Sequence, residues 1–331
     1  MRRSLANIVC AAAAATLIMG PLARAFDLEG HRGARGLAPE NTLPAFAAAM
    51  RIGVTTLELD IGMSKDDVVV ISHDSFLNPD HTRSPDGNFL QGRGPAIRAL
   101  TLAELKRYDV GRLKPGSSYA ASFPEQEAMD GIAIPTLAEL FELVRAANAD
   151  HIRFNIETKL TPTSAADTPD PETFAAALAS AVREAKLVER VSIQSFDWRT
   201  LVAMRRIAPE IERVCLTIDG GGGDTLHRGE SAASTWTAGF NVAAYNGSVP
   251  RLVAAAQCAA WSPLFHNLSP GSFAQAKALG LSVIPWTVND RAQMQQLIAL
   301  GVDGIITDYP NRLRALMAEN GMPLPRSVPV R

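Results

Sequence analysis

The alternation of two kinds of segment along almost the whole chain is the strongest constraint on its fold. Short runs rich in β-forming residues lie at residues 27–30, 55–61, 68–72, 152–157, 191–195, 211–217, 282–288 and 304–307, with a weaker run at 259–262. Alanine- and leucine-rich amphipathic stretches, which predict helices, lie at residues 43–51, 137–148, 171–185, 198–207, 249–256, 272–279, 291–300 and 311–319. In a chain of 331 residues, this alternation predicts an α/β fold, a (β/α)8 barrel. A doubly wound open sheet is the alternative.

Two segments depart from a regular barrel. The link at residues 62–67 is too short for the helix that joins parallel strands, so it predicts a hairpin or a distorted, extended connection. Residues 78–131 contain no clear strand, are rich in Pro, Gly and Ser, and are too long for an ordinary loop. They predict an inserted lid or subdomain, with one helix at residues 102–108 capped by Thr101.

The first 25 residues have the pattern of a secretory signal peptide. Arg2 and Arg3 provide a basic start, residues 5–20 are apolar and alanine-rich, and Ala23-Arg24-Ala25 fits a cleavage site. The apolar run is too short for a convincing membrane span, and the residues before Cys10 fit a lipoprotein anchor poorly. We therefore expect a single domain at residues 26–331 that is exported, periplasmic or secreted, without stable membrane insertion.

Charge and cysteine content add two further expectations. The formal net charge of −2 gives no electrostatic basis for nucleic-acid binding. Removal of the signal peptide leaves Cys215 and Cys258, which could pair in an oxidising compartment, although the sequence does not show that they are close. Two unpaired buried thiols are the preferred expectation. The oligomeric state is left open.

Three carboxylates follow the pattern of a metal site. Glu58 and Asp60 lie two residues apart on a predicted strand, so their side chains point to the same face. Two inward-facing carboxylates repel each other unless a cation lies between them. Glu157 ends another run of the same type, and three carboxylates without a thiolate favour Mg²⁺ or Ca²⁺ over zinc. The alternative is a solvated strand face.

Two histidines and two cations complete the candidate site. His31 and His73 each follow a predicted strand directly, and an imidazole can give or take a proton near neutral pH. Arg32 can hold a phosphate oxygen through two parallel hydrogen bonds, with a surface ion pair as its alternative role. Lys159 lies two residues after Glu157 and can offer an ammonium group on the same face, with a salt bridge to Glu157 as the alternative. These groups suit metal-assisted phosphodiester hydrolysis.

The chain resembles the glycerophosphodiester phosphodiesterases, in particular their exported bacterial type. The matching motifs run in order over nearly the whole chain: His31-Arg32-Gly33, Pro39-Glu40-Asn41-Thr42, Glu58-Leu59-Asp60, His73-Asp74, Glu157-Thr158-Lys159, Gln194-Ser195-Phe196, Trp286-Thr287-Val288-Asn289 and Gly304-Ile305-Ile306-Thr307-Asp308. The resemblance implies a distorted TIM (β/α)8 barrel with an insertion after the third strand. It also implies hydrolysis of small glycerophosphodiesters, such as glycerophosphocholine, to an alcohol and sn-glycerol 3-phosphate.

The resemblance further implies a role for each matching residue. Glu58, Asp60 and Glu157 would hold a divalent cation, and His31 and His73 would act as general acid and base. Arg32 and Lys159 would hold the phosphate, with Phe196 and Trp286 forming the pocket wall beside the glycerol. The sequence does not decide which histidine is the base, nor whether the nucleophile is water or the glycerol 2-hydroxyl.

Two other functions fit the same groups less well. A phospholipase of the same barrel type, acting on intact or lyso-phospholipids, calls for an apolar rim, whereas aromatic residues are only 6% of the chain. A periplasmic phosphoester-binding protein needs phosphate donors but has no use for two histidines around three carboxylates.

Overall fold

Eight parallel strands form a nearly closed barrel in the computed structural model, which describes residues 25–163, 166–230 and 232–330. Neighbouring strands follow the order β8 (Ser282–Val283), β7 (Ala260–Pro263), β6 (Glu212–Thr217), β5 (Val191–Ser195), β4 (Arg153–Thr158), β2 (Thr56–Met63), β1 (Asp27–Gly30) and β9 (Gly304–Thr307). Backbone bonds from Asp303 to Val283 and from Ile306 to Pro285, both 3.0 Å, join the two ends of this order. The barrel prediction is confirmed, and the open sheet is not formed.

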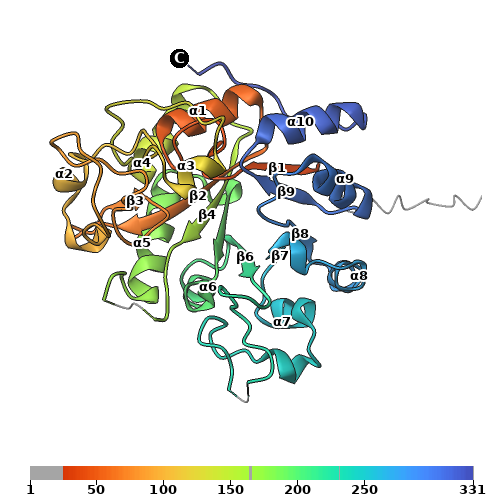
Figure 1. Cartoon of the computed structure of the whole chain (residues 1–331). Helices are drawn as coiled ribbons and strands as arrows, with labels where there is room; N and C mark the ends of the chain where they lie inside the picture. Colours follow the sequence, from red (N-terminus) through yellow and green to blue (C-terminus); the bar gives the residue numbers. More distant parts are fainter. Residues whose placement is uncertain (1–24, 164–165, 231, 331) are drawn as a thin grey trace, which may run out of the picture.

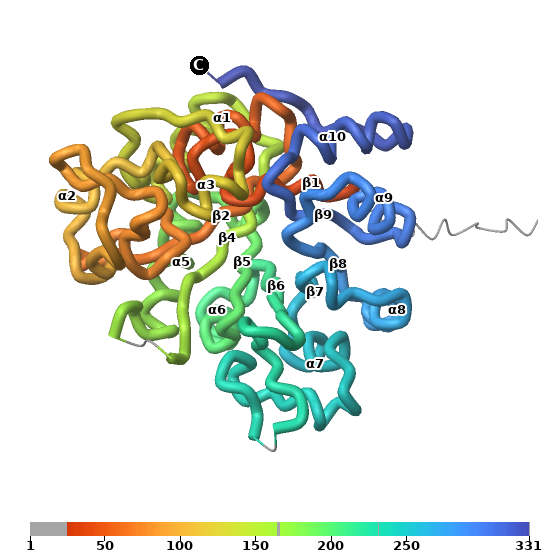
Figure 2. The backbone as a smooth tube through the Cα atoms, viewed as in Figure 1, coloured from red at the N-terminus to blue at the C-terminus, as the bar shows by residue number. Residues whose placement is uncertain are grey.

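Helices surround the barrel (Figures 1 and 2). They are α1 (Leu43–Ile52), α4 (Leu137–Ala146), α5 (Pro171–Glu184), α6 (Trp198–Ile207), α7 (Val249–Ala255), α8 (Pro270–Ala278), α9 (Arg291–Leu300) and α10 (Pro310–Glu319). Most begin at a polar residue whose side chain accepts a backbone N–H bond, as Thr42 does before α1 and Asp170 before α5. On α5, Phe174, Leu178 and Val182 are buried at helical spacing, so one face of the helix packs on the core. Within the described ranges, no helix is long and apolar enough to span a membrane.

The third predicted strand lies outside the parallel barrel. β3 (Val69–Ile71) pairs antiparallel with β2, with Ile61 opposite Ile71. The link between them is therefore the hairpin that its length predicts. Asp67 has a positive φ of 62° at the turn, where the Ser64 N–H donates to Val68 O at 2.9 Å. The hairpin carries the chain away from the barrel before the insertion begins.

The predicted insertion follows β3 and precedes α4 (Figure 1). It contains the short helices η1 (Ile97–Ala99), α2 (Leu102–Leu105) and α3 (Ser118–Ser122). A small separate core holds it together, formed by Val70, Leu77, Ile97, Leu105, Val110 and Ile134. Thr101 caps α2 as predicted, but the helix ends at Leu105 rather than at Tyr108. The reason is that Arg107 and Tyr108 donate to carbonyls only three residues back, at Glu104 and Leu105, in a tighter turn than an α-helix.

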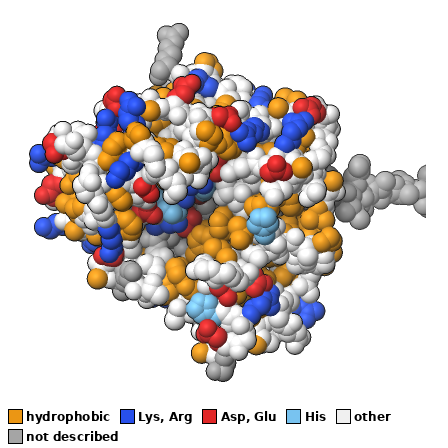
Figure 3. All heavy atoms as spheres, viewed as in Figure 1, with side chains coloured by type: hydrophobic (Ala, Val, Ile, Leu, Met, Phe, Trp, Pro, Cys, Tyr) orange, Lys and Arg blue, Asp and Glu red, His pale blue; other side chains and the backbone are white. Residues whose placement is uncertain are grey.

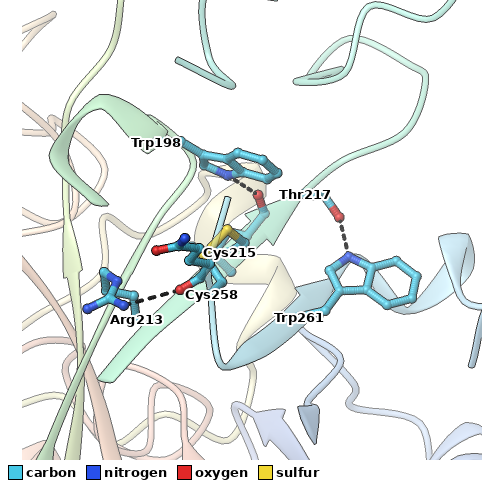
Figure 4. Close-up of a disulfide and its surroundings, with 8 residues drawn as sticks. Trp198, Arg213, Cys215, Thr217, Cys258 and Trp261 are labelled. Atoms are coloured by element: carbon cyan, nitrogen blue, oxygen red, sulfur yellow. Dashed lines mark hydrogen bonds between the residues drawn. A yellow bond between two sulfur atoms is a disulfide. The ribbon is translucent and has the colours of Figure 1, made fainter. Parts of the chain in front are cut away.

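Cys215 and Cys258 form a disulfide, so the expectation of two free thiols was wrong. Cys215 lies on β6 and Cys258 follows α7, and their Cα atoms are 5.8 Å apart (Figure 4). α7 leads the chain back to the barrel at β7, which pairs with β6, and this return places the two sulfurs together. Cys258 lies 43 residues after Cys215, and only the folded connection reveals that they meet. The predicted signal peptide, apart from Ala25, lies outside the described residues.

Candidate active site

The three predicted metal ligands lie together at the carboxyl ends of two adjacent strands. Glu58 and Asp60 are on β2, and Glu157 is on β4 in register with Asp60. One carboxylate oxygen from each residue lies within 4.8 Å of the other two. All three side chains are buried, so the solvated strand face considered as the alternative is not formed. The carboxyl ends of the strands are where barrel enzymes place their active sites.

The negative charges of the three carboxylates repel one another in this buried cluster. Burial and the neighbouring Asp60 raise the pKa of Glu58 well above its ordinary value. Burial also raises the pKa of Glu157 to about 7, with Lys159 opposing the shift and Asp60 adding to it. Burial would raise the pKa of Asp60 too, but His73, Lys159 and Arg32 together lower it below its usual range. The buried cluster therefore attracts further positive charge.

The donor set fits a hard divalent cation. Glu58 accepts hydrogen bonds at 2.8 Å on both oxygens, from Gln194 Nε2 and from the Arg32 backbone N–H. Asp60 Oδ2 accepts one from Asn41 Nδ2 at 2.9 Å. Asp60 Oδ1 is buried and has no hydrogen-bond partner among the described residues. Lys159 Nζ lies 3.6 Å from this oxygen, beyond hydrogen-bonding distance, so the oxygen is still open to a metal ion, and Mg²⁺ or Ca²⁺ takes oxygen ligands of this type.

His31 is held by the carboxylate of Asp308, which contacts the ring nitrogen that points away from the carboxylate cluster. Its Nδ1 lies 2.6 Å from Asp308 Oδ1, and its Nε2 lies 3.9 Å from Glu58 Oε2. Asp308 is itself fixed by Arg35 Nε at 2.8 Å and by Asn289 Nδ2 at 2.6 Å. Burial and the charge of Arg35 lower the pKa of His31 to about 4, against the opposing effect of Asp308. The Nδ1 contact leaves Nε2 facing the carboxylate cluster for proton transfer.

His73 has the same kind of support from a different part of the chain. It follows β3, and its Nδ1 lies 3.0 Å from Asp74 Oδ1. Asn78 Nδ2 donates to the other oxygen of Asp74 at 2.6 Å. Burial, followed by the charges of Arg32 and Lys159, lowers the pKa of His73 to about 4. A bound phosphodiester brings negative charge beside these cations, which raises the pKa of the imidazole again.

The two predicted phosphate-binding cations are both paired with carboxylates, and Arg32 is buried while Lys159 is partly buried. Arg32 Nη1 donates to Glu40 Oε1 at 2.6 Å, and Arg32 Nε lies 3.3 Å from Asp60 Oδ2. Lys159 Nζ donates to Glu157 Oε1 at 2.8 Å. The salt bridge considered as the alternative role of Lys159 is therefore present. Both cations nevertheless line the cavity beside the cluster, where an incoming phosphate would meet them.

A cavity of about 130 Å³ brings together eight of the nine predicted site residues. Those that line it are His31, Arg32, Glu58, His73, Glu157, Lys159, Phe196 and Trp286, while Asp60 lies in the carboxylate cluster at its wall. Phe196 and Trp286 meet edge to face with ring centroids 5.2 Å apart. Figure 3 shows a hollow in this face of the molecule, where histidine, basic and acidic side chains gather beside hydrophobic ones.

Comparison with known proteins agrees with this geometry. The model of the glycerophosphoryl diester phosphodiesterase family matches residues 31–312. The chain belongs to this family. A glycerophosphodiester phosphodiesterase of Caldanaerobacter subterraneus is 30% identical over 88% of this chain and 97% of the relative. A solved structure from Silicibacter pomeroyi, described as a glycerophosphoryl diester phosphodiesterase, is 33% identical, with a TM-score of 0.80 over 90% of this chain and 95% of the other.

A second solved structure shares the fold of this glycerophosphodiester phosphodiesterase family member at lower identity. It is a phosphodiesterase of Oleispira antarctica in complex with the product sn-glycerol-3-phosphate. It is 23% identical, with a TM-score of 0.61 over 88% of this chain and 96% of the other.

Several residues of this family member's site had no role predicted from the sequence. Asp308 and Asp74 stand in recognisable motifs, but only the fold shows that they hold the histidines. Tyr119 comes from α3 in the insertion, and its hydroxyl donates to Glu40 and accepts from Arg35 Nη1 at 3.3 Å. No local pattern marks Tyr119, because its place depends on how the insertion folds back over the barrel.

Proposed function

We propose that the protein hydrolyses glycerophosphodiesters to an alcohol and sn-glycerol 3-phosphate with the help of a divalent cation, Mg²⁺ or Ca²⁺. The observation that carries the proposal is the buried carboxylate cluster between two carboxylate-held histidines, in which Asp60 Oδ1 accepts no hydrogen bond from the described residues. The names of its relatives point to the same substrate class. The Oleispira antarctica phosphodiesterase that shares this fold is solved in complex with the product sn-glycerol-3-phosphate.

The residues of the cluster would hold the cation through one oxygen each of Glu58, Asp60 and Glu157. When bound, such a cation acts as a Lewis acid that stabilises negative charge on the phosphoryl oxygens. Arg32 and Lys159 line the same cavity and would add two fixed positive charges beside a phosphate bound there. The buried setting strengthens these interactions, because little water screens them.

The two histidines supply the proton transfers that the reaction needs. The P–O bond to the alcohol breaks, and the departing oxygen takes a proton from one imidazole. The other imidazole takes a proton from the nucleophile as the nucleophile forms its bond to phosphorus. If the nucleophile is water, the product is sn-glycerol 3-phosphate directly; if it is the glycerol 2-hydroxyl, a cyclic phosphate forms first and water then opens it to the same product. Asp308 and Asp74 orient the two rings through Nδ1, so that each Nε2 remains for this exchange.

Release of glycerol 3-phosphate tests the proposal directly. Purified protein is given glycerophosphocholine and glycerophosphoglycerol in a coupled assay, with EDTA and then with Mg²⁺ or Ca²⁺ added back. We expect release that EDTA abolishes and one of the two cations restores. Release that EDTA leaves unchanged would refute the cation requirement, and no release from either ester would refute the reaction.

We also propose that the mature protein works outside the cytoplasm, in the periplasm or the medium. Two observations support this proposal: the signal-peptide pattern of residues 1–25, and a disulfide of the kind that persists in oxidising compartments. Fractionation of cells that express the whole chain, or a chain without residues 2–25, tests it. Equal cytoplasmic retention of both forms would argue against export.

A further inference from the structure

A second cavity adjoins the catalytic one and has a different chemical character. It has a volume of about 330 Å³, against about 130 Å³ for the catalytic cavity. Four residues line both cavities: His73, Glu157, Lys159 and Phe196. The two spaces therefore meet where the proposed function places the phosphate. A phosphodiester bound there would have room for one ester arm in each cavity.

The lining of the larger cavity is mainly apolar. Phe76, Leu160, Phe196, Ile218 and Trp236 contribute to it from loops that follow β3, β4, β5 and β6. Its threonine hydroxyls are largely engaged elsewhere: Thr225 Oγ1 bonds to the backbone of Ile218, and Thr161 Oγ1 lies 2.8 Å from Thr163 Oγ1. An alcohol rich in hydroxyl groups would find few free partners on these walls.

Two of the three aromatic rings that line this cavity already lie beside a cation, which makes them poorly suited to bind an organic cation. An aromatic face binds a quaternary ammonium group best when no other cation occupies it. Lys159 Nζ already lies 5.8 Å from the ring centroid of Phe196, and the Arg93 guanidinium lies 4.7 Å from that of Phe76. The carboxylates at the margin are also engaged, Glu157 by Lys159 and Asp74 by His73 and Asn78. Among the described residues of the lining, a choline group would thus meet the Lys159 ammonium and carboxylates that already have partners.

We infer that this larger cavity is the subsite for the leaving alcohol, and that it favours phosphodiesters whose leaving alcohol carries an apolar chain. The inference rests on the proposed function and deepens it. The glycerol arm, which is common to all substrates of the proposed reaction, fits the smaller cavity beside Trp286. His73 lines both cavities, whereas His31 lines only the smaller one. His73 accordingly lies on the side of the departing oxygen and donates the proton to it.

Three esters of sn-glycerol 3-phosphate, with n-hexanol, glycerol or choline as the alcohol, test the subsite. They share the glycerol and phosphate and differ only in the arm assigned to the larger cavity. We expect the highest kcat/KM for the hexyl ester. In Trp236→Ala and in Ile218→Ser, the ratio of kcat/KM for the hexyl ester to that for the glyceryl ester falls by about 10-fold or more, because apolar contacts are lost. Both side chains are only partly buried, so these variants should fold.

Leu279→Ser is the matched control, because Leu279 is an apolar residue that is 42% exposed and lies outside both cavities. It should leave the ratio unchanged. A preference for the choline ester that Trp236→Ala abolishes would overturn the apolar assignment in favour of a cation subsite. Equal kcat/KM for all three esters, or variants that keep the wild-type ratio, would remove the subsite but leave the proposed function intact. Failure to hydrolyse any of the three would refute the proposed function itself.

Discussion

Asp308 Oδ1 lies 2.6 Å from Nδ1 of His31, although 277 residues separate the two in the chain. The contact fixes the tautomer of the imidazole, because a carboxylate at Nδ1 requires the proton there and leaves Nε2 as the acceptor. It is possible because β1 and β9 are neighbours in the barrel. His31 and Asp308 directly follow these two strands, so both side chains reach the same edge of the sheet.

Asp308→Asn should lower kcat by about 100-fold or more, since an amide can hold the imidazole in the wrong tautomer. KM should change little, because Asp308 does not line the cavity. Steady-state kinetics on a glycerophosphodiester check this. Asp130→Asn is the control, as Asp130 is also paired with arginines, Arg83 and Arg112, but on the surface. An Asp308→Asn enzyme with wild-type kcat would show that the contact does not support catalysis.

Cation binding should strengthen as the pH rises through about 7. The carboxyl group of Glu157 has a pKa raised to about 7, and that of Glu58 is raised as well, so below these values a cation must displace protons. Above them the carboxylates are already ionised, and the affinity levels off. Titration calorimetry with Mg²⁺ or Ca²⁺ at pH 6 and pH 8 measures the difference. In Glu157→Gln the affinity should be weaker and its pH dependence flatter; an affinity that is the same at both pH values in the wild type would contradict the site.

The loss of rate on replacing each histidine should depend differently on the leaving group of the substrate. A p-nitrophenolate leaves without a proton, so it needs no general acid. With the p-nitrophenyl ester of glycerol phosphate, His73→Ala should keep much of the wild-type rate, while on the hexyl or choline ester it should lose nearly all of it. His31→Ala should be equally impaired on all esters, because deprotonation of the nucleophile is still needed. If His31→Ala instead kept its rate on the p-nitrophenyl ester and His73→Ala did not, His31 would be the general acid and His73 the general base.

Reduction of the Cys215–Cys258 disulfide should lower the free energy of unfolding by about 2–4 kcal/mol. The cross-link closes a loop of the order of 40 residues and restricts the unfolded chain. Denaturant unfolding of the oxidised and reduced protein measures the effect, with Cys215→Ser/Cys258→Ser as the reference that cannot pair. Equal transition midpoints for all three forms would mean that the bond does not contribute to stability.

Periodic and local signals account for the part of this architecture that the sequence predicts. The alternation of strands and helices predicts the barrel, and the two-residue spacing of Glu58 and Asp60 predicts their common face. The short link before β3 predicts the hairpin. Each of these follows from the geometry of a single element or of one connection, which is why no tertiary information is needed.

Relations between distant segments account for what the sequence did not predict. The support of His31 by Asp308 depends on the first and last strands lying side by side, and the disulfide depends on the path of α7. The contact of Tyr119 with Glu40 depends on the insertion folding back over the barrel. In each case the residue types alone do not mark the contact, because the two partners are far apart in the sequence and only the folded chain brings them together.

The pairing of β1 with β9 also has a consequence for when the protein becomes active. The ring of strands is completed by its last member, so a chain still lacking its C-terminal segment has the carboxylate cluster and both histidines but not the Asp308 contact that orients His31. Catalysis would thus begin only after the whole polypeptide has been made and folded. If the chain is exported as proposed, this arrangement would keep the unfinished chain inert while phosphodiesters are still within its reach.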